Sequence, residues 1–233
     1  MATYVLIPGA GGDDWFWHRV VPGLEARGHE VVAVALPADD DSAGWAEYTD
    51  ATVEAIGGRT DLILVAQSLA GFSAPLVCDR VSVDLLVLLN AMIPRPGETG
   101  GDWWADTGQG EAQRAYLAEI GVTPEAAQDD AILYFHDVPP DVTAEAFRRG
   151  EPAQSMTPMT QPWPLDAWPD VPTRVLISSD DRLFPAAFQR RIAGERLGID
   201  ADEIDGGHLV ALSNPEGLID RLEGYRREVV GSG

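Results

Sequence analysis

The sequence predicts an α/β fold with a mostly parallel sheet and helices on both of its faces, and three observations lead to this class. Short apolar, β-branched runs alternate with helix-like segments over the first ninety residues. The same alternation returns near the C-terminal end. The composition, 233 residues that are 45% hydrophobic and 23% charged, is ordinary for a globular chain that needs no disulfide or metal to hold its core. We therefore expect a single domain over residues 1–233.

Four strands and three helices are expected in the first ninety residues. The strand runs are nearly all apolar, which is typical of parallel strands covered on both faces. Gly28 suits a C-terminal cap of the first helix, and Ser42 is placed to cap the second helix at its N-terminus. The expected strands are 4–7, 31–36, 62–66 and 85–89, and the expected helices are 15–27, 43–56 and 69–80.

The C-terminal region adds two strands and two helices. A strand is expected at 173–178, and Pro185 then suits the first turn of a helix over 186–197. A short strand at 199–204 and a helix at 215–229 follow. Strand–helix–strand units of this kind form parallel sheets through right-handed crossovers.

Residues 93–172 differ from both flanking regions. They hold 11 of the 17 prolines and four of the seven tryptophans, with helical pieces expected at 110–120 and 141–149. We interpret this segment as an insertion between two strands of the sheet. Long insertions at strand ends commonly cover a functional site, so we expect it to act as a helical lid.

The charge balance restricts the partners. The chain has 16 basic and 38 acidic residues, a net charge of -22, and every basic residue is an arginine. A surface this anionic disfavours nucleic acid and membrane lipid as partners. The absence of lysine excludes a lysine Schiff base, including lysine-bound pyridoxal phosphate.

Other sequence features bear on location and cofactors. The N-terminus lacks a basic segment and enters a strand-like run at once, and no run of about 18 apolar residues exists, so we expect a cytoplasmic protein. Cys78 is the single cysteine. Neither zinc-like spacing, a calcium loop nor a dinucleotide-binding glycine motif is found, so we expect no metal and no cofactor.

The segment from Leu62 to Gly71 carries the most specific motif. A buried strand ends, Ser68 follows, and a helix-like segment begins, as in a nucleophile elbow. Such a turn needs small residues two positions before and after the serine, and Ala66 and Ala70 stand there. The alternative interpretation is a serine that caps a helix after a buried strand.

An acid and a histidine follow in the order that the motif requires. Asp180 and Asp181 come directly after the strand at 173–178, and His208 comes later in a Gly-Gly-His turn. A neutral serine is a poor nucleophile, so a histidine must take its proton and a carboxylate must orient that histidine. The chain order of serine, aspartate and histidine is typical of one hydrolase fold.

With these residues, the chain resembles the α/β-hydrolase superfamily, and within it the small-molecule esterase branch that includes plant methylesterases and hydroxynitrile lyases. The loop Pro8-Gly9-Ala10-Gly11-Gly12 and the segment Trp15-Phe16-Trp17 carry the resemblance to this branch. The resemblance implies that the backbone N–H groups of Ala10 and Leu69 form an oxyanion hole. It also implies an acid four residues before a proline, which favours Asp181 over Asp180.

The expected function is hydrolysis of a small-molecule carboxylic ester through an acyl-serine intermediate. Ser68 is the expected nucleophile, His208 the general base and Asp181 the group that orients it. A lactone-acting or cyclising enzyme of secondary metabolism with the same triad, and a non-catalytic ligand-binding protein of the same fold, are the alternatives. Hydroxynitrile lyases of this branch typically carry Thr and Lys at the positions of Gly9 and Leu209, which disfavours that activity. The oligomeric state is left open, a homo-oligomer included.

Overall fold

The computed structural model describes residues 1–230 and contains a six-stranded sheet in which every neighbouring pair is parallel. The strand order is β2-β1-β3-β4-β5-β6, so the chain winds outward in both directions from its first strands. The predicted fold class is confirmed. The strands are β1 (Thr3–Ile7), β2 (Glu30–Ala33), β3 (Leu62–Gln67), β4 (Leu85–Leu89), β5 (Thr173–Ser178) and β6 (Asp202–Ile204).

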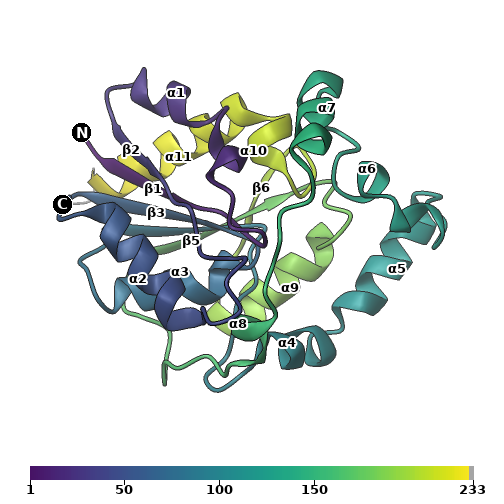
Figure 1. Cartoon of the computed structure of the whole chain (residues 1–233), viewed down its shortest axis with the longest axis horizontal. Coiled ribbons are helices and arrows are strands. Elements are labelled where there is room, and N and C mark those ends of the chain that lie inside the picture. Colours follow the sequence, from purple (N-terminus) through teal and green to yellow (C-terminus); the bar gives the residue numbers. More distant parts are fainter. Residues whose placement is uncertain (231–233) are drawn as a thin grey trace.

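Helices cover both faces of this sheet (Figure 1). One face is covered by α2 (Trp45–Ile56), α3 (Ala70–Cys78) and α9 (Ala186–Leu197), and the other by α1 (Val21–Glu25), α10 (Val210–Ser213) and α11 (Pro215–Val230). The side chains of alternate strand residues pack against the helices on opposite faces of the sheet. In β3, Leu64 and Ala66 pack toward α2 and α3, whereas Ile63 and Val65 pack toward α1 and α11.

Several predicted elements are confirmed at both ends, namely β4, β5 and α9. The prediction of one continuous helix over 15–27 is wrong. It is divided into a 3-10 helix, η1 (Asp14–Trp17), and the short α1. Asp13 caps η1 by accepting the N–H of Trp15, and Pro22 stands in the first turn of α1, where its missing N–H costs nothing.

Further boundaries differ from the predictions. The strand expected at 199–204 is limited to β6 (Asp202–Ile204), and the helix expected at 69–80 to α3 (Ala70–Cys78). The residue that precedes α2 is Gly44 rather than Ser42, and the carboxylate of Glu47 accepts the Gly44 N–H at 2.8 Å. The Ser42 hydroxyl instead donates to Asp40 at 2.6 Å. Strand β2 ends at Ala33 rather than at residue 36, because the chain then turns so that the N–H of Leu36 reaches the carbonyl of Gly12 at 3.0 Å.

The segment between β4 and β5 holds its own short helices beyond the carboxyl ends of the strands (Figure 1). Two buried tryptophans attach it to the core. The indole N–H of Trp103 donates to the carbonyl of Ile93 at 3.2 Å, and that of Trp163 to the carbonyl of Phe72 at 2.9 Å. Its helices are α4 (Gly100–Asp106), α5 (Gln109–Glu119), η2 (Ala126–Gln128), α6 (Asp130–Leu133), α7 (Pro140–Arg149) and α8 (Thr157–Thr160).

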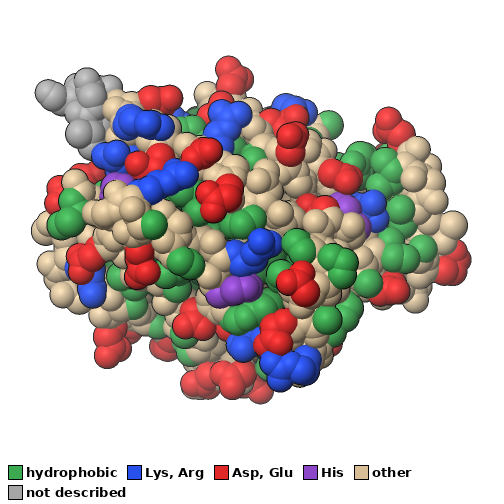
Figure 2. Space-filling view, turned by 90° about the horizontal axis from the view of Figure 1, so that it is seen from above, with side chains coloured by type: hydrophobic (Ala, Val, Ile, Leu, Met, Phe, Trp, Pro, Cys, Tyr) green, Lys and Arg blue, Asp and Glu red, His purple; other side chains and the backbone are tan. Residues whose placement is uncertain are grey.

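The surface is strongly acidic, as the net charge of -22 requires. Figure 2 shows acidic side chains spread over the face seen from above, with arginines among them. Within residues 1–230, no helix combines the length and the apolar character needed to cross a bilayer.

Candidate active site

The backbone at Ser68 turns sharply between β3 and α3. Ser68 has a φ of 52°, in the left-handed region that residues with a side chain rarely adopt. Its N–H donates to the carbonyl of Leu89 at 3.1 Å, and its carbonyl accepts the N–H of Met92 at 2.9 Å. The end of β4 therefore holds both backbone groups of this strained residue, which keeps its side chain in one position.

Small residues around the turn allow the chain segments to approach closely. A Cβ on Gly71 would lie 1.8 Å from the carbonyl oxygen of Met92, so only glycine fits there. A Cβ on Gly9 would lie 2.3 Å from Oε1 of Gln67 and 2.8 Å from Cβ of Ser68. The position that requires glycine in this turn is therefore Gly71, one residue after Ala70.

Three side chains far apart in the sequence meet at this turn. The hydroxyl of Ser68 lies 3.0 Å from Nε2 of His208, and Nδ1 of His208 lies 2.7 Å from Oδ2 of Asp181. All three residues are buried. A neutral imidazole with its proton on Nδ1 would donate to Asp181 and accept the hydroxyl proton of Ser68. The arrangement can therefore transfer a proton from the serine to the histidine.

Asp181 is held by donors other than the histidine. Its Oδ1 accepts the backbone N–H groups of Leu183 and Phe184, both at 2.8 Å, and its Oδ2 accepts from Nε2 of Gln189 at 3.3 Å. These bonds compensate the burial of a carboxylate that has no contact with water. The neighbouring Asp180 is 44% exposed at its side chain and accepts the hydroxyl of Tyr116 at 2.6 Å.

The loop that carries His208 is fixed by two residues that the sequence analysis did not single out. Asp137 accepts the N–H of Gly207 at 2.6 Å. Asn90, directly after β4, donates to the Ser178 hydroxyl at 2.8 Å and to the carbonyl of His208 at 3.3 Å. Asn90 is a polar residue directly after an apolar strand, a sequence pattern that could have indicated a role at the edge of the sheet. Nothing in the sequence around Asp137 indicates its contact with Gly207.

The two backbone N–H groups predicted to form an oxyanion hole belong to the residue after the serine and to the loop whose Gly9 packs against it. Leu69 follows Ser68 at the start of α3, where the helix dipole favours negative charge. Ala10 lies in the loop after β1. Neither N–H makes a hydrogen bond to any residue in the part of the chain that the structure describes. Both donors are therefore available to an external acceptor.

The loop around Ala10 is held by the segment that returns from the insertion. Oε1 of Gln154 accepts the N–H of Gly11 at 2.9 Å. The amide nitrogen of Gln154 donates to the Tyr48 hydroxyl at 3.0 Å and to the carbonyl of Ser155 at 2.7 Å, which fixes the orientation of the amide. Gln154 is a second residue with a clear contact in the site that no sequence pattern indicates.

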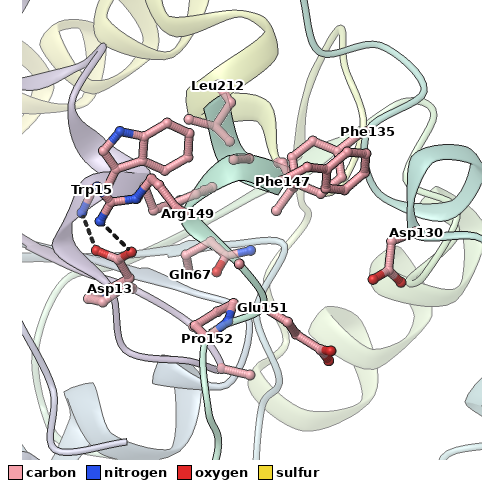
Figure 3. A pocket seen from close by; sticks show the side chains of 17 residues that line it. Asp13, Trp15, Gln67, Asp130, Phe135, Phe147, Arg149, Glu151, Pro152 and Leu212 are labelled. Atoms are coloured by element: carbon pink, nitrogen blue, oxygen red, sulfur yellow. Dashed lines mark hydrogen bonds and ion pairs between the residues drawn. The ribbon is translucent and has the colours of Figure 1, made fainter. Parts of the chain in front are cut away.

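A cavity of about 230 Å³ lies beside this centre (Figure 3). Gly9 and Ala10 of the loop, Gln67 before the serine and Leu209 after the histidine form part of its wall. The remaining wall comes largely from residues 13–16, 130–135 and 146–152. The insertion therefore supplies much of the surface that a ligand in this cavity would meet.

The other histidines lie outside this chain of contacts. His18 stacks on Trp15 with ring centroids 4.5 Å apart. His29 lies directly before β2, at the amino ends of the strands, with its Nε2 3.0 Å from the Glu223 carboxylate. The side chain of His136 is only 8% exposed, and its Nε2 lies 3.2 Å from the Asp180 carboxylate. None of these three histidines contacts Ser68 or Asp181 in the part of the chain that the structure describes.

Comparison with known proteins places the chain in a family. The alpha/beta hydrolase family model matches residues 4–221. An alpha-hydroxynitrile lyase from Arabidopsis thaliana is 25% identical over 249 residues, which cover 94% of this chain and 95% of that protein. Methylesterase 3 of the same plant is 31% identical over 103 residues, which cover 39% of each chain.

The fold agrees with solved structures as well. The crystal structure of polyneuridine aldehyde esterase superposes with a TM-score of 0.76, covers 97% of this chain and 99% of its own, and shares 19% sequence identity. A likeness at this identity concerns the fold alone. With the family model matching nearly the whole chain, the protein belongs to the alpha/beta hydrolase family.

Proposed function

We propose that this protein is a serine hydrolase that cleaves a small-molecule carboxylic ester through an acyl-serine intermediate. The observation that carries the proposal is the continuous hydrogen-bond chain from Ser68 through His208 to Asp181. Relatives that are named esterases give it further support.

In the first half of the proposed reaction, the Ser68 hydroxyl attacks the ester carbonyl while His208 takes its proton. Asp181 holds the imidazole in the required tautomer and stabilises its charged form. The N–H groups of Ala10 and Leu69 bind the oxyanion, and each such donor contributes roughly 3–4 kcal/mol in comparable enzymes. His208 then gives the proton to the leaving alcohol, and Ser68 carries the acyl group.

In the second half, water takes the place of the alcohol. His208 removes a proton from the water as it attacks the acyl-serine, and the same two N–H groups stabilise the second oxyanion. Collapse of that intermediate releases the carboxylic acid and returns the proton to Ser68. The insertion over residues 93–172 acts as the lid that shapes the binding cavity in this proposal.

Cyanohydrin cleavage, the activity named for the Arabidopsis relative, is less compatible with the loop. Lyases of this branch typically carry Thr where Gly9 stands. A Cβ at this position would lie 2.8 Å from Cβ of Ser68 and 2.3 Å from Oε1 of Gln67, so a threonine requires the loop or the turn at Ser68 to shift. Incubation with mandelonitrile and measurement of released cyanide tests this directly, and we expect no release above the uncatalysed background.

A fluorophosphonate probe tests the proposal. We expect stoichiometric labelling of the wild-type protein, no labelling of Ser68→Ala, and strongly slowed labelling of His208→Ala. Ser73→Ala is a matched control, since Ser73 is also a buried serine but lies within α3. Hydrolysis of p-nitrophenyl butyrate should follow the same order. Equal labelling of the wild type and Ser68→Ala contradicts the proposal.

A further inference from the structure

The cavity beside Ser68 has an aromatic wall. Trp15 lies at one end, and the rings of Phe135 and Phe147 pack against each other with centroids 5.1 Å apart. Figure 3 shows these rings on the same side of the cavity as Leu212. Aromatic and aliphatic walls of this kind bind apolar ligand groups, and the faces of aromatic rings also attract cations.

The charged side chains of the cavity divide into two groups. At one end Arg149 pairs with Asp13 at 3.0 Å and lies over the Trp15 ring, with its guanidinium carbon 5.1 Å from the ring centroid. At the other end, Figure 3 shows the carboxylates of Asp130 and Glu151. The Arg149–Asp13 pair is neutral, so the remaining two carboxylates leave the cavity with a net negative charge.

Asp130 and Glu151 have no counter-ion of their own. Within residues 1–230, neither carboxylate makes a hydrogen bond or an ion pair, and both are exposed. The chain contains no lysine, and its net charge of -22 adds to the local field. A negatively charged ligand would therefore be repelled from this end of the cavity, and a positively charged one attracted.

The cavity that holds these carboxylates also borders the candidate catalytic centre, because Gln67 and Leu209, the neighbours of Ser68 and His208 in the chain, belong to its wall. The ring of Tyr134 lies 6.1 Å from that of His208. Burial raises the pKa of Tyr134, and the negative charges of Asp130, Asp181 and Glu151 raise it further. Ala10 and Leu209, which adjoin the triad, line the same cavity as Asp130 and Glu151. A ligand that fills the cavity can therefore reach from the candidate catalytic centre to the two carboxylates.

We propose that this cavity recognises an ester whose apolar acyl or alcohol part carries a positively charged amine, with the ammonium group at the Asp130–Glu151 end. The inference rests on the proposed ester hydrolysis and names the substrate class for it. The aromatic wall takes the apolar body, and the two carboxylates select the charge. A substrate that carries a carboxylate in the same position is disfavoured.

Matched esters test this selection. In one series of p-nitrophenyl esters, the acyl chain ends after three methylene groups in a trimethylammonium, a tert-butyl or a carboxylate group, so that shape is similar and charge changes. A second series compares the butyrate ester of choline with its tert-butyl carbon analogue, which places the charge on the alcohol. We expect kcat/KM for the cation to exceed that for the neutral analogue by about tenfold in at least one series.

The double variant Asp130→Asn with Glu151→Gln removes both charges while keeping the shape of the side chains. We expect it to reduce the preference for the cation to about twofold or less, with hydrolysis of the neutral ester nearly unchanged. The control is Glu54→Gln with Glu119→Gln, which changes the net charge equally at two exposed glutamates outside the cavity wall. The wild-type preference should also shrink as salt is added.

The outcomes separate this inference from the proposed function. If the neutral esters are hydrolysed in a Ser68-dependent way but neither series prefers the cation, or the preference survives in the double variant, the inference is overturned and ester hydrolysis stands. If no ester is hydrolysed, the binding of hexyltrimethylammonium to Ser68→Ala is measured by calorimetry, with and without the double substitution. Binding that the double substitution weakens supports the cation site, and absence of binding overturns it.

Discussion

Replacing Gly71 with alanine tests whether the backbone around Ser68 is held in one strained conformation. The added Cβ would lie 1.8 Å from the carbonyl oxygen of Met92 and 2.8 Å from its carbonyl carbon. Backbone atoms must therefore separate by about 1 Å to reach a tolerable contact. Overpacking of a core usually costs about 1–3 kcal/mol, and a rigid backbone neighbour places Gly71→Ala at the upper end of that range.

The same displacement acts on the nucleophile. The N–H of Met92 donates to the Ser68 carbonyl at 2.9 Å, so movement of Met92 removes one of the bonds that hold Ser68 at positive φ. A misplacement of about 1 Å near the reacting groups can cost about a hundredfold in rate. We expect Gly71→Ala to lower both the free energy of unfolding and the rate of fluorophosphonate labelling.

Urea denaturation followed by tryptophan fluorescence measures the first effect, and labelling of the fraction that remains folded measures the second. Ala70→Gly is the control, because it restores the usual motif and removes only a methyl group. Its expected cost is about 0.5–1 kcal/mol with labelling close to the wild-type rate. If Gly71→Ala unfolds within about 0.5 kcal/mol of wild type and labels at the wild-type rate, the argument from close approach is refuted.

Asp181→Asn keeps the shape of the side chain but favours the wrong tautomer of His208, so kcat should fall about 10³–10⁴-fold with KM little changed. The kcat of Asp180→Asn should stay within about tenfold of wild type. Steady-state kinetics on p-nitrophenyl butyrate distinguish the two variants. Gln154→Leu removes the acceptor of the Gly11 N–H and should lower kcat by about ten- to a hundredfold. Affinity for an alkyl boronic acid, which mimics the tetrahedral intermediate, should fall to a similar extent. Unchanged inhibition by the boronic acid would contradict a role of Gln154 in holding the oxyanion loop. Burial raises the pKa of Glu223, but hydrogen bonds from Arg226 and Tyr4 outweigh it and lower that pKa to about 2 from its ordinary value of 4.5. The resulting stabilisation is present above about pH 4.5 and is lost as the pH falls toward 2, so Glu223→Gln should cost about 1–2 kcal/mol at pH 7 and progressively less at pH 3, measured by urea denaturation at both values.

The elements predicted at the correct residues share a local cause. Strand β4 is an apolar run between Asp84 and Asn90, β5 begins directly after Pro172, and α9 begins directly after Pro185. The triad residues of the candidate site could be predicted from the sequence for the same reason. The small residues around Ser68, an acid after a strand and a histidine after two glycines are patterns of a few neighbouring residues.

What the sequence does not reveal depends on contacts between distant segments. Gln154 reaches Gly11 across 143 positions, and Asp137 reaches Gly207 across 70. Each is a single polar residue in a proline-rich insertion, where neither hydrophobic periodicity nor a motif assigns it a partner. The break between η1 and α1 is different, because Pro22 has no N–H to donate within a helix. The sequence alone could therefore have indicated that a helix starts near Pro22.

Detection of the acyl-enzyme tests the central claim most directly. The wild-type protein is mixed with p-nitrophenyl butyrate, quenched in acid within the first turnover, digested and analysed by mass spectrometry. The proposed mechanism predicts a butyryl group on the peptide that contains Ser68, with a burst of p-nitrophenol of matching size, and neither in Ser68→Ala. Wild-type turnover by Ser68→Ala, or an acyl group only on another residue, would contradict the proposed role of Ser68 as the nucleophile.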